Sequence, residues 1–236
     1  MKAVILAGGF GKRLKPLTDS TPKPLVKVGG KPILVMQLEW LRSHGINNVV
    51  LCIGFLKEKV MEFIGNGEQF NMSVDYSLEE GPLGTGGALL NAKRFLNMDE
   101  AFFVLNGDVI TDMDPLRVKN NLNGKIGSLA LVPLRSTYGI IELSDEGMIG
   151  QFREKPLIQG HWMNAGVYCF SPEIFRYLTN RGNIESTAFP VLAEKGSLKG
   201  VKCADCFWKS IDGWKDIEET EKALKERHLS YESTSI

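Results

Sequence analysis

The chain opens with a stretch, KAVILAGGFGKR at residues 2–13, in which an apolar run passes directly into a glycine-rich, basic turn. This order predicts a buried β-strand whose carboxyl end meets a loop able to surround an anion with bare backbone N–H groups. The loop is not a P-loop, because Gly-x-x-x-x-Gly-Lys-Ser/Thr is absent. It is not a dinucleotide fingerprint, because Leu14 stands at the position of the third glycine. On the glycines alone, a solvated turn with a basic tip fits equally well.

Short apolar runs alternate with amphipathic stretches through the first half of the chain. The predicted strands cover residues 2–7, 48–53, 73–76, 102–105 and 127–132, and the predicted helices cover residues 33–44, 57–64, 86–95 and 115–121. Such alternation is typical of βαβ units. We therefore expect an α/β fold with a mostly parallel sheet flanked by helices, which binds its ligand beyond the carboxyl ends of the strands.

The pattern changes near residue 135. Strands separated by turns are predicted at residues 139–143, 147–152 and 165–170, a helix is expected after Ser171-Pro172, and a last helix at residues 215–227. We predict one domain over residues 1–228, with a lobe at 1–134 and a smaller, partly antiparallel lobe at 135–228. A frayed polar tail is expected at residues 229–236.

The composition argues against several classes of function. Lysine plus arginine number 28, as do aspartate plus glutamate, so the formal net charge of the 236 residues is zero. This leaves no charge field to hold a nucleic acid or an anionic membrane, and no apolar run is long enough to span a bilayer. Four cysteines make no disulfide framework and the first residues have no signal-peptide layout, so we expect a cytoplasmic protein.

Two further segments carry charged residues in restrained settings. Lys23 lies between two prolines in PKPL at residues 22–25, and such rigidity benefits a lysine that must meet a phosphate. Asp108 follows the apolar strand at residues 102–105, where its carboxylate is expected to point into a cleft and to suit Mg²⁺. An aspartate in an ordinary turn beside Asn-Gly is the alternative.

Six motifs then occur in order: LAGGxGxRL at residues 6–14 with PKPL at 22–25, PLGTGGA at 82–88, NGD at 106–108, YG at 138–139, EKP at 154–156 and NAG at 164–166. This series resembles the signature of the sugar-1-phosphate nucleotidyltransferases, or NDP-sugar pyrophosphorylases. The resemblance implies a Rossmann-like, GT-A-like fold. It also implies that a sugar 1-phosphate oxygen attacks the α-phosphorus of an NTP and that pyrophosphate leaves. Both substrates are polyanions, so positioning and charge neutralisation are required and a protein nucleophile is not.

The resemblance also implies residue roles. In the lobe at residues 1–134, the resemblance implies that the nucleotide is bound by Leu6, Ala7, Gly8, Gly9, Gly11, Arg13, Lys23, Gly84, Thr85 and Gly86. It implies that the sugar phosphate is bound by Asn106, Gly139, Glu154, Lys155 and Asn164. The catalytic residues would be Arg13, Lys23 and Asp108, and the Mg²⁺ ligands Asp108 and Asp212. Asp216 is an alternative ligand, because the Gly-Thr-Pro that usually follows the second aspartate is missing. Lys12 stands where many relatives carry threonine or serine, and it either adds charge or faces solvent.

Several substrates and classes stay open. The motifs at residues 83–88 and 104–108 are most similar to guanylyltransferases acting on mannose or heptose 1-phosphate, which predicts GTP. GHWMN at residues 160–164 and the segment from 207 to Asp212 resemble glucose-1-phosphate cytidylyltransferases, and thymidylyl or uridylyl transfer also stays open. Another class is a non-catalytic regulatory subunit that binds nucleotide sugars, which the presence of Arg13, Lys23 and Asp108 disfavours.

A third class is a glycosyltransferase using Asp112 and Asp114, although Asp114 is expected to cap the next helix. Cys203 and Cys206 form a lone Cys-x-x-Cys without a spaced partner set for zinc, and we expect an inert thiol pair on a strand. Self-association into a homo-oligomer is left open.

Overall fold

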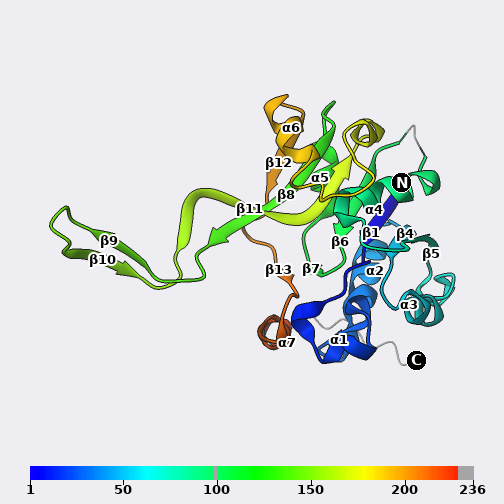
Figure 1. Ribbon diagram of the computed structural model, residues 1–236, viewed down its shortest axis with the longest axis horizontal. Coiled ribbons are helices and arrows are strands. Elements are labelled where there is room, and N and C mark those ends of the chain that lie inside the picture. The colour runs from blue at the N-terminus through cyan, green and yellow to red at the C-terminus, as the bar shows by residue number, and fades with distance from the viewer. Residues whose placement is uncertain (98–99, 228–236) are drawn as a thin grey trace.

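The computed structural model describes residues 1–97 and 100–227. A seven-stranded sheet in the order β12-β8-β11-β6-β1-β4-β5 forms its centre (Figure 1). Its strands are β1 (Lys2–Leu6), β4 (Asn48–Ile53), β5 (Ser73–Leu78), β6 (Phe102–Asn106), β8 (Gly127–Arg135), β11 (Leu157–Phe170) and β12 (Leu198–Lys202). All neighbouring strands pair in parallel except β11, which is antiparallel to β6 and to β8. The predicted α/β fold with a mostly parallel sheet is confirmed.

Three two-stranded sheets and the helices complete the fold. The small sheets pair β2 (Lys27–Val28) with β3 (Lys31–Pro32), β7 (Val109–Thr111) with β13 (Trp208–Ser210), and β9 (Ile140–Leu143) with β10 (Ile149–Arg153). The α-helices are α1 (Leu17–Ser20), α2 (Ile33–Ser43), α3 (Lys57–Ile64), α4 (Gly84–Ala92), α5 (Pro115–Asn120), α6 (Ala188–Glu194) and α7 (Trp214–Glu226). Short 3₁₀ helices cover Lys12–Leu14, Lys23–Leu25, Glu68–Phe70, Lys93–Phe95 and Pro172–Arg176. In the described part of the chain, no helix is both long and apolar enough to span a membrane.

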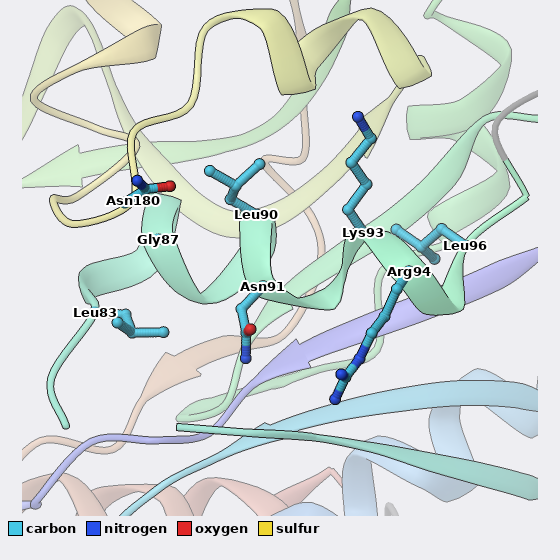
Figure 2. Close-up of a pocket in the computed structure, with 8 residues that line it drawn as sticks. All are labelled: Leu83, Gly87, Leu90, Asn91, Lys93, Arg94, Leu96 and Asn180. Atoms are coloured by element: carbon cyan, nitrogen blue, oxygen red, sulfur yellow. The ribbon is translucent and has the colours of Figure 1, made fainter. Parts of the chain in front are cut away.

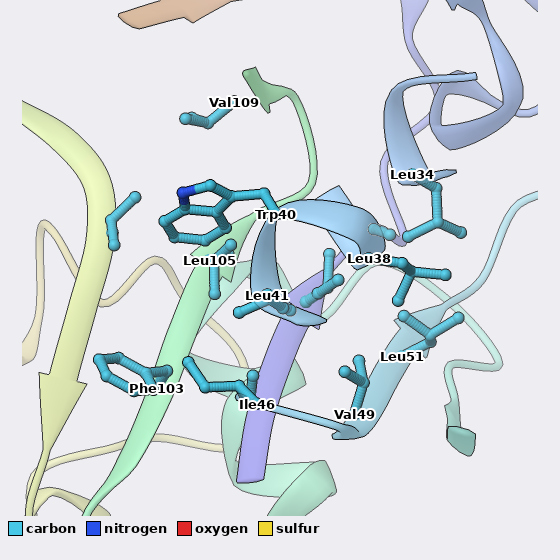
Figure 3. Packing of buried hydrophobic residues seen from close by; sticks show 14 of the residues in the cluster. Leu34, Leu38, Trp40, Leu41, Ile46, Val49, Leu51, Phe103, Leu105 and Val109 are labelled. Atoms are coloured by element: carbon cyan, nitrogen blue, oxygen red, sulfur yellow. The ribbon is translucent and has the colours of Figure 1, made fainter. Parts of the chain in front are cut away.

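The central sheet is buried on both faces, as its unbroken apolar strands require. Along β1, Ala3 and Ile5 belong to the buried cluster on one face, which includes residues of α2, α3 and α5, whereas Val4 belongs to the cluster on the other face, which includes residues of α4 and α6. Figure 3 shows the first of these layers, in which leucines of α2 and Trp40 lie over β1, β4 and β6. The Trp40 indole N–H also donates to the carbonyl of Met113 at 2.9 Å, so this large side chain is fully satisfied.

A third hydrophobic cluster lies beside the sheet. It joins the loop after β1, the start of α2, the β7–β13 pair and α7 through ten buried residues, among them Leu14, Ile110, Ile211 and Ile217. Segments from the two ends of the chain are therefore held against one another by apolar packing. This cluster fixes the relative positions of the loop and of the segment that contains Asp212.

The segment after Arg135 only partly forms a separate lobe. β9 and β10 form a hairpin that projects from the body of the molecule (Figure 1). β11 and β12 belong to the same central sheet as β1, so the predicted lobes share one sheet, and the boundary at residues 134/135 stays a prediction. The helix expected after Ser171 is a 3₁₀ helix, and the Ser171 side chain makes no cap hydrogen bond. The predicted tail at residues 229–236 lies outside the described residues.

Candidate active site

The glycine-rich loop leaves β1 at the carboxyl edge of the sheet and is anchored at both ends. Gly11 has a φ of 61°, in the left-handed region, and its carbonyl accepts a hydrogen bond from the hydroxyl of buried Thr18 at 2.9 Å. Leu14 is fully buried in the third hydrophobic cluster. The loop is therefore held in place at Gly11 and Leu14, while its basic tip at Lys12 and Arg13 is exposed to solvent. Its predicted role in binding a nucleotide stays a prediction.

Lys23 lies at the centre of a convergent charge cluster. Its Nζ atom is 2.7 Å from Oδ2 of Asp108 and 3.1 Å from Oδ1 of Asp212, and the same Oδ1 atom is 2.7 Å from Arg13. The side chain of Lys23 is 15% exposed and those of Asp108 and Asp212 are 26% and 32% exposed, whereas Arg13 is 74% exposed. The first three groups are thus largely shielded from solvent, and Arg13 reaches them from outside.

Backbone pairing explains why the two aspartates meet. The N–H of Gly107 donates to the carbonyl of Leu6, which joins the end of β6 to the end of β1. The N–H of Ile211 donates to the carbonyl of Asp108 at 2.9 Å, and β13 pairs with β7 directly beyond it. A cavity of about 80 Å³ lies at this junction, lined by Leu6, Ala7, Gly9, Lys23, Pro24, Gly107 and Asp108.

The other candidate acids have structural partners. Asp216 accepts the backbone N–H groups of Asp212 at 2.9 Å and Gly213 at 2.7 Å, so it caps α7 and holds the Asp212 backbone. Asp112 accepts the N–H of Phe207 at 2.6 Å and pairs with Arg227. Asp114 accepts the N–H of Leu116 at 2.9 Å, as expected of the cap of α5. In the described part of the chain, no ion pair joins any of these three acids to Lys23, in contrast to Asp108 and Asp212.

Gln37 supports the Asp108 turn and was missed by sequence reasoning. It is 3% exposed on α2, and its Nε2 atom donates to the carbonyls of Asn106 and Val109 at 2.9 and 2.8 Å. These two carbonyls flank Asp108 on either side. A buried glutamine among the apolar residues of a predicted helix was the available signal, because such a group must find a partner in the fold.

Glu79 is a second residue that the sequence did not single out. It follows β5, is 8% exposed, and lies so close to Gly8 that a methyl group there would overlap its carboxylate. Burial raises the pKa of Glu79, and a hydrogen bond from the backbone of Leu83 partly offsets the shift. The glycine loop therefore has a buried carboxylate directly beside it.

The segment Gly84–Gly86 is bonded to another loop. The N–H of Gly86 donates to the carbonyl of Gly182 at 2.9 Å, and a side chain at Gly84 would lie 2.7 Å from the same carbonyl. The Thr85 hydroxyl donates to Glu185 at 2.6 Å and accepts from the N–H of Ile184. Close packing against residues 182–185 thus accounts for this glycine run, and in the described part of the chain no hydrogen bond or ion pair joins it to Lys23 or Asp108. The predicted contact of Gly84, Thr85 and Gly86 with the nucleotide stays a prediction.

The predicted sugar-side residues fall into two groups. Asn106 and Asn164 lie beside Tyr168, a fully buried residue whose hydroxyl accepts from Nδ2 of Asn164 at 2.8 Å. Burial raises the pKa of Tyr168, and the negative charge of Glu185 and, to a lesser extent, that of Asp108 raise it further. The Oδ1 atom of Asn106 is buried without a partner among the described residues.

The second group lies on the projecting hairpin. Tyr138 is 79% exposed, Glu154 and Lys155 form a loose exposed pair at 3.9 Å, and a side chain at Gly139 would meet the Phe152 ring. The described contacts do not connect these residues with Lys23 or Asp108. Their predicted sugar-binding role is untested.

The remaining features of interest carry no catalytic chemistry. Burial raises the pKa of Cys169 to about 12 and of Cys206 to about 11, so neither thiol is poised as a nucleophile. Cys203 and Cys206 follow β12 in a loop, which corrects their expected place on a strand, and no group of three metal-binding side chains occurs in the described ranges. Lys12 is exposed, with its ammonium 5.8 Å from the centre of the Phe10 ring.

A larger cavity of about 700 Å³ lies along α4, away from the charge cluster, and its lining includes Leu90, Lys93, Arg94 and Asn180. Figure 2 shows Lys93 and Arg94 pointing to opposite sides of the helix, so the two cations do not converge on one position. This cavity therefore lacks the arrangement expected of an anion site.

The chain matches the model of the nucleotidyl transferase family over residues 2–227. It is 38% identical over 226 residues to a mannose-1-phosphate guanylyltransferase catalytic subunit beta of Danio rerio, and 37% identical over 225 residues to the protein of that name from Dictyostelium discoideum. Each match covers 92% of this chain and 62% of the relative, so the chain spans less than two thirds of the curated relatives it matches.

Among solved structures, HddC from Yersinia pseudotuberculosis superposes with a TM-score of 0.75 at 26% identity, covering 94% of this chain and 99% of that chain. HddC complexed with GMP-PN superposes with a TM-score of 0.74. The family model covers nearly the whole described chain, and the fold and the motif order agree with it. The chain therefore belongs to the nucleotidyl transferase family.

Proposed function

We propose that this protein transfers a guanylyl group from GTP to a sugar 1-phosphate, with mannose or heptose 1-phosphate as acceptor, in the cytoplasm. The observation that supports this most directly is the convergence of Lys23, Asp108 and Asp212 beside the fixed glycine loop. Fixed cations and N–H groups next to paired carboxylates suit a reaction between two polyanions. The reaction forms a bond from the sugar phosphate oxygen to the α-phosphorus and breaks the bond to pyrophosphate.

The two carboxylates fit a divalent cation. Asp108 and Asp212 each place an oxygen within 3.1 Å of one ammonium nitrogen, so a single positive group already stands between them. Hard carboxylate oxygens in this number suit Mg²⁺, which fills its remaining positions with phosphate oxygens and water. Asp108 and Asp212 would hold the ion, and Asp216 would hold the Asp212 backbone. When bound, the ion would neutralise charge on the phosphates.

Lys23 and Arg13 are the cations available to the substrates. In the absence of substrate, Lys23 neutralises the two carboxylates. With a triphosphate and Mg²⁺ in place, its ammonium would be free to contact the α-phosphate and the incoming sugar phosphate. Arg13, on the exposed side, would contact the leaving phosphates and stabilise their charge. These roles keep the catalytic assignments of Arg13, Lys23 and Asp108.

Glu79 supports guanine as the base. A carboxylate accepts two donors side by side, and the Watson–Crick edge of guanine presents N1–H and N2–H₂ as adjacent donors. Adenine, cytosine and uracil each present a single donor group on that edge. The buried carboxylate lies directly against Gly8 of the nucleotide loop. The names of the curated relatives and the binding of GMP-PN by HddC point to the same base.

The other classes have less support. A non-catalytic nucleotide-sugar-binding subunit would not need the Lys23–Asp108–Asp212 cluster, which is intact here. A glycosyltransferase using Asp112 and Asp114 would need free carboxylates, and both already accept backbone N–H groups. Cytosine, thymine and uracil would each offer the Glu79 carboxylate one donor group where guanine offers two.

One assay tests these proposals together. The protein is incubated with Mg²⁺, each of GTP, CTP, UTP and dTTP, and mannose, heptose or glucose 1-phosphate, and pyrophosphate is measured. We expect release that requires a sugar phosphate and is fastest with GTP. If pyrophosphate is released fastest with another nucleotide, the base of that nucleotide replaces guanine in the proposal. Binding of a GDP-sugar without release of pyrophosphate would favour the non-catalytic regulatory subunit. Omission of Mg²⁺ tests the metal assignment in the same experiment.

A further inference from the structure

The projecting arm, residues 136–156, is an amphipathic two-stranded hairpin. β9 and β10 pair only with each other, and Figure 1 shows them extending away from the central sheet. Their register sets Ile141 opposite Phe152 and Leu143 opposite Ile149. Ile141 and Leu143 are two residues apart in β9 and therefore share one face. The register shift at Gly150 brings their partners Phe152 and Ile149, three residues apart in β10, to that same face.

The opposite face of the arm is polar. There Glu142 stands opposite Gln151, Ile140 stands opposite Arg153, and the Arg153 guanidinium pairs with Glu142. Antiparallel sheets with one apolar and one polar face normally bury the apolar face against a core. The arm has the residue pattern of a half-buried sheet, although its apolar face is open in the described structure.

The apolar face is extensively exposed. The exposed fractions are 46% for Ile141, 66% for Leu143, 62% for Ile149 and 61% for Phe152. Of 14 exposed large hydrophobic residues in the described part of the chain, seven lie between residues 138 and 157. A lone hairpin is at best marginally stable in water, and concentrated apolar exposure marks an interaction surface. The arm therefore requires a partner on this face.

We propose that the partner is a second copy of this chain, whose arm lies antiparallel and face to face across a two-fold axis. The charges along the arm support this occupant. The tip carries Asp145 and Glu146, whereas the base carries Arg135 and Lys155 beside one carboxylate, Glu154. A two-fold interface must be self-complementary, and antiparallel arms place the acidic tip of each copy against the basic base of the other.

The size of the apolar face indicates how strong the association is. If each of the four side chains covers roughly 100 Å², two copies bury about 800 Å² of apolar surface, which is below the range of stable interfaces and typical of weak, transient ones. We therefore expect a dimer that forms with increasing concentration. Because the tip and base charges are exposed, its affinity falls as salt increases.

Sedimentation velocity from about 1 to 100 µM tests this expectation, a range that spans weak to moderate dimer affinities. The wild type should pass from monomer to dimer, and the double variant Leu143→Asp/Ile149→Asp should stay monomeric throughout. Matched controls are Leu116→Asp and Val191→Asp, which change exposed apolar residues of α5 and α6 and should dimerise like the wild type. Circular dichroism shows whether each variant is folded.

A charge exchange tests the antiparallel arrangement. Asp145→Lys/Glu146→Lys makes the tip basic, and Arg135→Glu/Lys155→Glu makes the base acidic, so each variant alone should repel its own copy and dimerise at least tenfold more weakly. An equimolar mixture should restore the dimer, because both tip-to-base contacts become attractive. A wild type that is monomeric at 100 µM, an unaffected Leu143→Asp/Ile149→Asp variant, or a mixture without recovery would each overturn the proposal.

Discussion

Replacing Asp108 by asparagine tests the proposed site most directly. The change removes one negative charge 2.7 Å from Lys23 but keeps an oxygen that can accept the same hydrogen bond. Asp212 stays within 3.1 Å of the lysine, so the ammonium keeps a counter-ion. Because Asp212 still pairs with the lysine and the asparagine oxygen can keep the hydrogen bond, we expect the stability to change by only about 1 kcal/mol, or roughly 2–4 °C in Tm for a chain of this length.

The cost to catalysis should be much larger. Loss of one charged group that acts on the reacting phosphates typically lowers kcat by about 10²–10³-fold, which corresponds to roughly 3–4 kcal/mol. Pyrophosphate release from GTP and mannose 1-phosphate measures this loss, and thermal melting measures stability in the same samples. The expected result for Asp108→Asn is therefore a large fall in turnover at nearly constant Tm.

A matched control lies four positions away. Asp112→Asn makes the same chemical change in an acid that accepts from Phe207 and pairs with Arg227, outside the charge cluster. It should keep turnover within about twofold of the wild type, because its partners are structural. Wild-type turnover in Asp108→Asn would refute the metal and phosphate assignment. An equal loss in both variants would show that the effect is not specific to the site.

The remaining predictions concern neighbours of this cluster. Asp212→Asn should lose turnover like Asp108→Asn. Asp216→Ala should chiefly lower the free energy of unfolding, by the roughly 1 kcal/mol of a lost helix cap, and this loss is read as a lower Tm. Gln37→Met should raise the Mg²⁺ concentration that gives the half-maximal rate, because the carbonyls flanking Asp108 lose their hydrogen-bond donor. A lower Tm with an unchanged Mg²⁺ titration would indicate that Gln37 has a structural role only. Glu79→Gln should reduce the preference for GTP over other NTPs in kcat/KM. The Tm of Glu79→Gln minus that of the wild type should also increase as the pH rises above the usual pKa of glutamate. The reason is that burial raises the pKa of the Glu79 carboxyl, so its ionisation destabilises the folded wild type. A Tm difference that does not change with pH would contradict this. Arg13→Ala should lower kcat with little change in Tm, because its side chain is 74% exposed, and a change in KM alone would exclude its proposed role.

The central elements could be predicted because their signals are local. Apolar runs bounded by turn residues predicted β1, β4 and β6 to within a residue, and helical periodicity predicted α2 and α3 equally well. Packing of the sheet on both faces preserves these local preferences, so sequence and structure agree there. The short strands β7 and β13, of three residues each, were not predicted, because strands of that length have no measurable periodicity.

The site was predictable where a motif stands on a strand end and less so where distant segments meet. Asp108 follows β6 directly, whereas Asp212 is set in place by pairing of β13 with β7, across about a hundred residues. The sequence favoured Asp212 over Asp216 without excluding either, because it shows neither the contact of Asp212 with Lys23 nor the capping contacts of Asp216. The buried side chains of Gln37 and Glu79 likewise gain their significance from segments that the sequence does not show to be adjacent.

The position of Lys23 has a consequence for the order in which ligands bind. Its ammonium stands between the two carboxylates that would hold a cation, so a divalent ion that arrives alone must displace a positive charge already paired at 2.7 and 3.1 Å. Displacement leaves a lysine that is 15% exposed without a counter-ion, which is costly in a shielded position. A nucleotide triphosphate removes that cost, because it brings the anionic oxygens to which the ammonium can turn. If Asp108 and Asp212 hold a divalent ion, as proposed, this geometry would favour its entry together with the nucleotide over its entry alone.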